Sequence, residues 1–172
     1  ASTLWAILSG QLGALVGIAL DYITILAPLT IFMFLLGQYP LSLFFAIGVL
    51  LGLSLLLWSI RKPIDQTIAL PRPVYWSFIF FIIALLIVSS QLIRGVPNII
   101  PWQITPELSV VIGWMFLGAA FYFGYSLIRP SWNNAAGQLA GFLAYDIVLI
   151  VPFLQRLPGV APGFRNGLIT YL

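Results

Sequence analysis

Two long stretches of the chain, residues 41–60 and 74–93, contain no charged residue and consist mainly of apolar ones. About 20 mainly apolar residues are needed for a helix to cross a bilayer. Each stretch therefore predicts a membrane-spanning helix. Pro40 stands at the first position of the earlier helix, where a missing amide hydrogen costs nothing. Arg61-Lys62-Pro63 ends this helix, and the chain resumes at Pro71-Arg72-Pro73.

A third span is predicted over residues 108–128, between clear start and stop signals. Thr105 supplies a capping hydroxyl, Pro106 suits the first turn, and Glu107 places an acid near the positive end of the helix dipole. Arg129 follows the last apolar residue, so a cation lies at the negative end.

A fourth span is predicted over residues 135–154, after the polar turn formed by residues 131–134. This span contains Gln138 and Asp146. Its Leu, Ile, Val and Phe residues each favour insertion by about 0.3 to 0.6 kcal/mol and together offset an acid that costs about 2.5 to 3.5 kcal/mol. We therefore expect the segment to insert despite its polar residues.

The first 36 residues hold one charge, Asp21. They favour a single tilted span over residues 11–36, kinked at Pro28. The alternative is a re-entrant pair of helices broken at Asp21. The stretch before Asp21 lacks a small-residue cleavage site followed by a polar region, so it is interpreted as a first membrane segment and not a signal peptide. The last residues, 167–172, read like the start of a sixth span.

The predicted fold is an all-α polytopic transmembrane helix bundle of about five spans, within a single integral membrane domain over residues 1–172. Trp residues concentrate at membrane–water interfaces. Trp58 and Trp76 flank the 61–73 loop, Trp102 precedes the 108–128 span and Trp132 follows it. Residues 94–107 are apolar and rich in proline, so we expect them to lie along the interface.

Composition agrees with a membrane location, because 62% of the residues are hydrophobic and only 6% are charged. A soluble domain carries roughly 25% charged residues, so the outer surface must face lipid or other apolar protein. The seven cations are scattered, which argues against nucleic-acid binding. The loop 61–73 holds the densest cationic cluster and is expected on the cytoplasmic side. The residues predicted to anchor at the interface or contact lipid head groups are Arg61, Lys62, Arg72, Arg129, Trp58 and Trp76.

The chain contains no His and no Cys. This excludes a His-ligated haem or metal, a Cys-ligated cluster and thiol chemistry, so no metal site is expected and lipids are the expected ligands. The four acids, Asp21, Asp65, Glu107 and Asp146, are far apart in the sequence, and no nucleophile–base pair or phosphate-binding loop appears. We therefore expect no catalytic site.

Asp146 is the most distinctive candidate, because it lies within a turn of the midpoint of the last span. An acid inside the membrane needs a partner or a proton. It is either a hydrogen-bonded group that fixes helix packing or a group that handles an ion or ligand. Antiparallel pairing through the 129–134 turn would place Asp146 near Gly118, Gly141 near Tyr122 and Gln138 near Tyr125. The expected intramembrane polar site consists of Asp146, Tyr145, Gln138, Tyr122 and Tyr125, with Tyr122 as the best internal hydrogen-bond donor.

Small residues at helical spacing predict close helix approaches. The three pairs are Gly13 with Gly17, Gly48 with Gly52, and Gly137 with Gly141. They serve either packing within the bundle or faces for partner subunits. Aromatic runs over residues 75–81 and 114–125 fit helix packing or lipid contact more simply than a pigment, quinone or lipid site.

The favoured function is a non-catalytic integral membrane subunit, or an assembly or stabilising factor, of a larger membrane protein complex, with energy-transducing complexes among the candidates. The alternative is a small transporter or proton or ion pathway that uses Asp146. A lipid-modifying enzyme ranks third, because ionisable residues are too sparse.

Overall fold

The computed structural model describes residues 2–100 and 102–159. Every regular element in these residues is a helix, which confirms the predicted all-α fold. In chain order the elements are α1 (Ser2–Leu8), the 3-10 turn η1 (Leu12–Ala14), α2 (Leu15–Leu35), α3 (Tyr39–Ser59), α4 (Arg72–Ile93), α5 (Pro106–Ile128), α6 (Trp132–Arg156) and the 3-10 turn η2 (Leu157–Gly159).

Five helical segments are long and apolar enough to cross a membrane, which confirms the predicted bundle of about five spans. The chain is therefore an integral, multi-pass membrane protein. The spans run over Leu12–Leu35, Tyr39–Ser59, Arg72–Ile93, Pro106–Ile128 and Trp132–Gln155. The predicted third span begins at the expected signal, since Thr105 accepts a hydrogen bond from the Leu108 amide. The fourth begins earlier than predicted, at Trp132 within the polar turn, where Ser131 accepts a hydrogen bond from the Asn134 amide. The C-terminal residues that suggested a sixth span lie outside the described residues.

The first 36 residues form two helices and not one. The short α1 ends before Gly10, which has a φ of +72° that favours glycine. The chain then turns into η1 and α2, which together correspond to the expected span over residues 11–36. Because α2 runs unbroken through Asp21 and contains Pro28, the re-entrant alternative is wrong.

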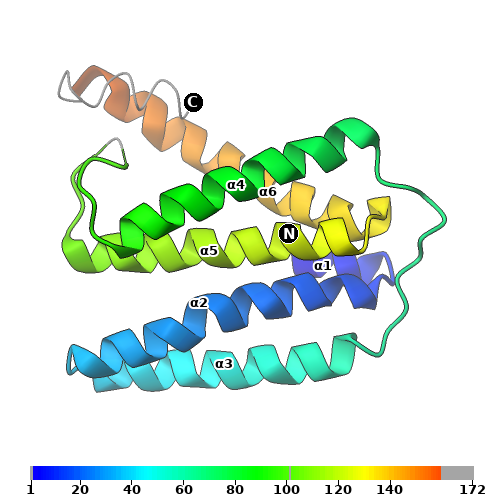
Figure 1. Cartoon of the computed structure of the whole chain (residues 1–172), viewed down its shortest axis with the longest axis horizontal. Helices are drawn as coiled ribbons and strands as arrows, with labels where there is room; N and C mark the ends of the chain where they lie inside the picture. The colour runs from blue at the N-terminus through cyan, green and yellow to red at the C-terminus, as the bar shows by residue number, and fades with distance from the viewer. Residues whose placement is uncertain (1, 101, 160–172) are drawn as a thin grey trace.

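The spans form two antiparallel pairs and one additional helix (Figure 1). Helix α2 pairs with α3, α4 pairs with α5, and the two pairs meet where α2 packs against α5. Helix α6 begins beside the end of α5, contacts α1, and then leaves the bundle. A buried apolar cluster centred on Phe78, Leu85 and Phe123 joins α4 to α5 and to the start of α6.

The expected antiparallel pairing of α5 with α6 holds only near the turn that connects them. There, Ser126 donates a hydrogen bond to Gln138 and the rings of Phe123 and Phe142 are in contact. Beyond Phe142 most α6 side chains are exposed, and the expected contact between Asp146 and Gly118 is wrong. The physical reason is that α2 already occupies the face of α5 around Gly118.

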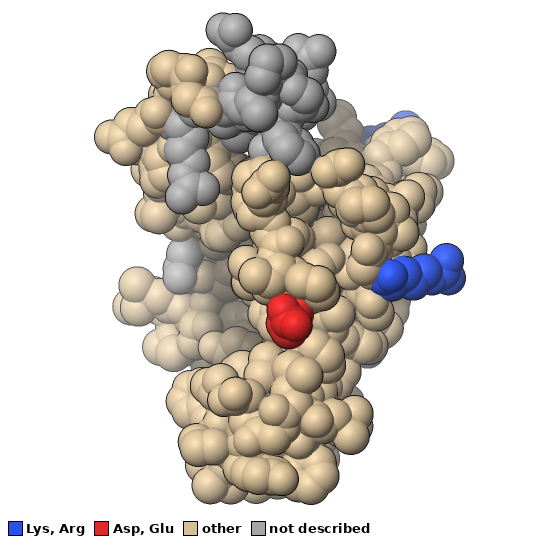
Figure 2. Space-filling model, turned by 90° about the vertical axis from the view of Figure 1, so that its left-hand side faces the viewer, with Lys and Arg blue, Asp and Glu red and all other residues tan. Residues whose placement is uncertain are grey.

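Charged side chains are sparse on the surface. On the end of the bundle seen in Figure 2, acidic and basic groups are few and isolated among uncharged residues. Large apolar side chains are instead exposed along all five spans. An apolar surface of this kind is suited to contact with the hydrocarbon core of a bilayer and not with water.

Candidate functional site

Two of the three small-residue pairs pack against other elements of this chain. One pair lies at η1 and the start of α2, and the other lies at the centre of α3. A Cβ atom on Gly13 would meet the 62–64 segment, and one on Gly17 would meet the ring of Tyr122. On α3, Gly48 faces Leu26, and Gly52 faces Tyr22 and Ile23 of α2. These glycines therefore let α2 approach α5 and α3 closely.

The third pair, Gly137 and Gly141 of α6, receives α1. A Cβ atom on Gly137 would lie 2.9 Å from Trp5 Cδ1, and one on Gly141 would clash with the hydroxyl of Ser2. All three pairs thus serve packing within the chain, as one of the two interpretations of the sequence expected.

Asp21 occupies the position between spans that the sequence had suggested for Asp146. It lies half-buried near the middle of the first span, and a Cβ atom on Gly118 of α5 would lie 2.7 Å from its Oδ1 atom. Tyr122, one turn further along α5, is within electrostatic reach of the same carboxyl group. Within the described residues the Asp21 carboxyl group has no hydrogen bond or ion pair, so Asp21 is an acid inside the membrane at the α2–α5 contact.

The two tyrosines of the expected polar site connect α5 to the N-terminal part of the chain. Tyr122 is buried with its ring against Gly17, and its hydroxyl group lies next to Ser2 of α1. Tyr125 donates a hydrogen bond of 3.3 Å from its hydroxyl group to the carbonyl oxygen of Gly13. Ser2 therefore lies between Tyr122 and Gly141, and Tyr122 is not a donor to Asp146.

Gln138 belongs to a separate buried polar cluster at the turn between α5 and α6. It is fully buried, and its Oε1 atom accepts a hydrogen bond of 2.9 Å from Ser126. Asn134, one turn earlier, is also fully buried and donates through Nδ2 to the carbonyl oxygen of Arg129 at 3.1 Å. Two buried atoms of this cluster, Gln138 Nε2 and Asn134 Oδ1, have no hydrogen-bond partner among the described residues. No sequence pattern indicated Ser126, and Asn134 was expected only as part of a polar turn.

The connection between α3 and α4 is tied to the starts of α2 and α6. Asp65 accepts hydrogen bonds from the Thr67 amide at 2.9 Å and from Asn133 Nδ2 at 3.3 Å, and its own amide donates to Gln11 Oε1 at 3.0 Å. The bond from the Thr67 backbone holds the pKa of Asp65 below its ordinary value. The Trp132 amide also donates to the carbonyl oxygen of Ile68, at 2.9 Å. This loop is thus fixed by polar contacts, and its Leu70 is also buried in the apolar cluster with Phe78.

The residues expected at the membrane interface gather at one end of the bundle. They lie at the end of α3, the start of α4 and the end of α5, which Figure 1 places on the same side. The ammonium group of Lys62 lies 5.5 Å from the centre of the Trp58 ring, a cation–π geometry. Contact of these residues with lipid head groups, and the cytoplasmic location of this loop, stay predictions.

Four phenylalanines form a packed cluster. The ring of Phe123 contacts those of Phe78, Phe81 and Phe142, with centroids 4.7 to 4.9 Å apart. Phe81 and Phe142 complete the cluster at 5.5 Å. Edge-to-face contacts at these distances fill the space between α4, α5 and α6, so these rings hold the helices together.

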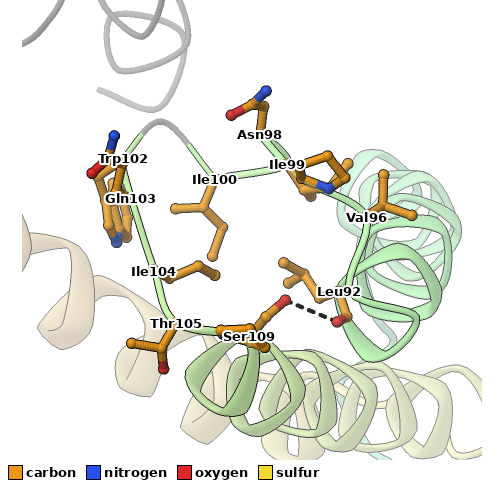
Figure 3. A pocket seen from close by; sticks show the side chains of 13 residues that line it. Leu92, Val96, Asn98, Ile99, Ile100, Trp102, Gln103, Ile104, Thr105 and Ser109 are labelled. Carbon is orange, nitrogen blue, oxygen red and sulfur yellow. Dashed lines mark hydrogen bonds between the residues drawn. The ribbon is translucent and has the colours of Figure 1, made fainter.

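The connection between α4 and α5, expected along the interface, encloses a cavity of about 340 Å³ (Figure 3). The apolar side chains of Ile100, Ile104 and Leu92 line it, and the Ser109 hydroxyl group donates to the Leu92 carbonyl oxygen at 2.8 Å. The loop reverses at Asn98, which has a φ of +62°. No charged side chain is among the described lining residues.

Asp146 is exposed on α6 together with its neighbour Tyr145. Beyond its packed first part, which ends at Phe142, helix α6 contacts the rest of the molecule near its end through Phe153, whose ring lies 5.5 Å from that of Trp102. Between these two contacts the helix stands away from the bundle, and Asp146 lies in that interval. Within residues 2–100 and 102–159, Asp146 has no hydrogen bond or ion pair, so the structure does not bring it together with Gln138, Tyr122 or Tyr125.

Comparison with known proteins found no matching family model, no matching curated protein and no matching solved structure.

Proposed function

We propose that this protein is a non-catalytic integral membrane subunit, or an assembly or stabilising factor, of a larger membrane protein complex. The observation that carries the proposal is the second half of α6, which leaves the bundle and exposes Asp146 inside a membrane span. Apolar exposure alone would not distinguish a subunit from a solitary protein, because lipid covers apolar helices equally well.

Lipid does not cover a charged or acidic group as well as it covers an apolar one. An aspartate at the centre of a span costs about 2.5 to 3.5 kcal/mol on insertion scales, and such residues nearly always face protein or water. Asp146 instead lies on a helix surface that the described part of the chain leaves uncovered. Another membrane protein packed on α6 would remove this cost.

An ion pathway through Asp146, Tyr122 and Gln138 has less support, because these residues do not share a site. Gln138 is fully buried against Ser126, and Tyr122 is buried between α5, α2 and α1. The arrangement therefore favours the subunit over the pathway.

The proposal is tested by isolating the protein from its native membrane in a mild detergent and measuring the mass of the assembly by native mass spectrometry. We expect the chain within a larger assembly of fixed stoichiometry. Bulky substitutions on one side of α6, Leu143→Trp combined with Ile150→Trp, are expected to release it.

Val148→Trp is the matched control, because Val148 lies two residues from Asp146 and so about 200° around the helix, on its opposite side. Val148 is more exposed than Leu143 and Ile150, so the same increase in size there should leave the assembly intact. A chain recovered only as a monomer with lipid, or an assembly indifferent to the paired substitutions, would contradict the proposal.

A further inference from the structure

We infer that one face of α6 binds a transmembrane helix of a different protein, and that this helix carries a Lys or Arg at the depth of Asp146. The inference rests on the proposed function, because it names the chemistry of the partner that such a subunit would bind. It is carried by the exposure of the face, by the missing counter-charge and by the distribution of cations in this chain.

The face is a continuous stripe at helical spacing, consisting of Leu143, Asp146, Ile150 and Leu154. Steps of three and four residues align these side chains along one side of the helix. Leu143, Ile150 and Leu154 are 61%, 45% and 52% exposed, and Asp146 is exposed as well. The stripe is therefore open along about three turns and is apolar on both sides of a single acid.

The chain's own cations nearest along α6 are too far from Asp146 to neutralise it. Arg156 is ten residues away, roughly 15 Å along the helix axis, and Arg129 is seventeen residues away, roughly 25 Å. Among the described residues Asp146 makes no ion pair. If Asp146 is ionised, its counter-charge therefore comes from outside this part of the chain.

A second copy of the chain does not supply such a charge. Of the seven cations, six lie at helix ends or in connections: Arg61, Lys62, Arg72, Arg94, Arg129 and Arg156. The seventh, Arg165, lies outside the described residues. Within the described residues, the acids Asp21 and Asp146 are the Asp, Glu, Lys or Arg side chains near the centres of the spans, so a like copy would bring carboxyl groups to a carboxyl group. A partner of different sequence fits the stripe better than a second copy.

The test uses the purified protein in phosphatidylcholine vesicles. The chain has no cysteine, so Gln155→Cys gives one attachment point for a fluorescence donor near the end of α6. The probes are acceptor-labelled, Leu-rich transmembrane peptides of about 22 residues with Arg or Leu at the central position. We expect the Arg peptide to bind roughly tenfold more tightly than the Leu peptide, about the size of one strong polar contact in a membrane.

Variants assign this preference to Asp146. Asp146→Leu should remove the difference between the two peptides, Asp146→Asn should reduce it, and Val148→Trp should leave it unchanged. Circular dichroism of each variant shows that the helices are retained. Equal binding of the two peptides, or no binding of the Arg peptide, overturns the inference.

Three further outcomes test the inference, and the last of them separates it from the proposed function. If Arg165→Gln alone strengthens binding of the Arg peptide, the chain supplies its own counter-charge and the inference fails. If two differently labelled copies associate as strongly as the protein and the Arg peptide, the face binds a second copy. A third outcome is that Leu143→Trp combined with Ile150→Trp dissociates the native assembly while Asp146→Asn has no effect on it. The proposed function is then supported, and the inference that the partner helix carries a Lys or Arg is contradicted.

Discussion

The carboxyl group of Asp21 on α2 faces Gly118 on α5, where a Cβ atom would lie 2.7 Å from Asp21 Oδ1. The same Cβ atom would also clash with Ile25. A glycine at position 118 thus lets an acidic side chain fit between two spans. The contact joins the α2–α3 pair to the α4–α5 pair.

Gly118→Ala should weaken this contact, because α2 must shift to admit the methyl group. We expect a loss of about 1 to 3 kcal/mol in the free energy of unfolding, typical of overpacking. Unfolding in mixed micelles with increasing sodium dodecyl sulfate, followed by circular dichroism, measures it. Gly124→Ala on the same helix is the control, because nothing lies within 4 Å of a Cβ atom there, and it should be neutral or slightly stabilising. Equal effects of the two substitutions would contradict the described α2–α5 contact.

Asp21→Asn should preserve the shape of the side chain while removing its charge. Because the described residues give the carboxyl group no hydrogen bond or ion pair, we expect the free energy of unfolding to rise, by about 1 kcal/mol. The same unfolding measurement checks this. A clear loss of stability in Asp21→Asn would mean that the carboxylate has a cationic partner.

Ser126→Ala should leave the buried Oε1 atom of Gln138 without its donor. The expected loss in the free energy of unfolding is about 1 kcal/mol, because a buried acceptor loses its donor and such hydrogen bonds stabilise membrane proteins only modestly. Ser54→Ala is the matched control, because the Ser54 hydroxyl group is on an exposed side of α3 and donates only to the carbonyl oxygen one turn back. Similar stability for both variants would show that the Ser126–Gln138 contact contributes nothing.

The loop around Asp65 should loosen at low pH. The hydrogen bond from the Thr67 amide favours the charged carboxylate and lowers the pKa of Asp65 in the folded protein below 3.8. A depressed pKa stabilises the fold at pH values above 3.8, and this contribution is lost as the pH falls through the lower, folded value. Nuclear magnetic resonance of the Thr67 amide in micelles should show the transition. Asp65→Asn should abolish the titration, and an unchanged titration in that variant would assign it to another group.

The spans were predictable because their signals are local. A run of apolar residues, a proline, a capping Thr105 or a terminal Arg129 determines where a helix begins and ends, whatever lies around it. The same reasoning found the pairs of small residues, and the structure shows what each pair receives. Gly137 illustrates the limit, because no pattern in α6 indicates that Trp5 of α1 packs there.

The arrangement of the spans was less predictable, because neighbouring helices in the sequence need not stay together over their whole length. The pairing register proposed for α5 and α6 is nearly right at Ser126 and Gln138 and fails beyond Phe142. Which helix packs on Gly118 depends on competition between α2 and α6, and that competition is decided by three-dimensional packing. Sequence reasoning therefore identified an intramembrane acid that lacks a partner, but it placed the wrong acid next to Tyr122.

The polar ties around Asp65 also constrain the order in which this protein assembles during its synthesis. The α2–α3 and α4–α5 pairs join neighbouring segments, so each can form soon after its second helix enters the membrane. The bonds from Asp65 to Gln11 and Asn133 span 54 and 68 residues of sequence. The second of these must wait until the start of α6 has left the ribosome. The connection between α3 and α4 is thus fixed last, by the start of α6. The second half of this same helix is the part that we propose binds a partner.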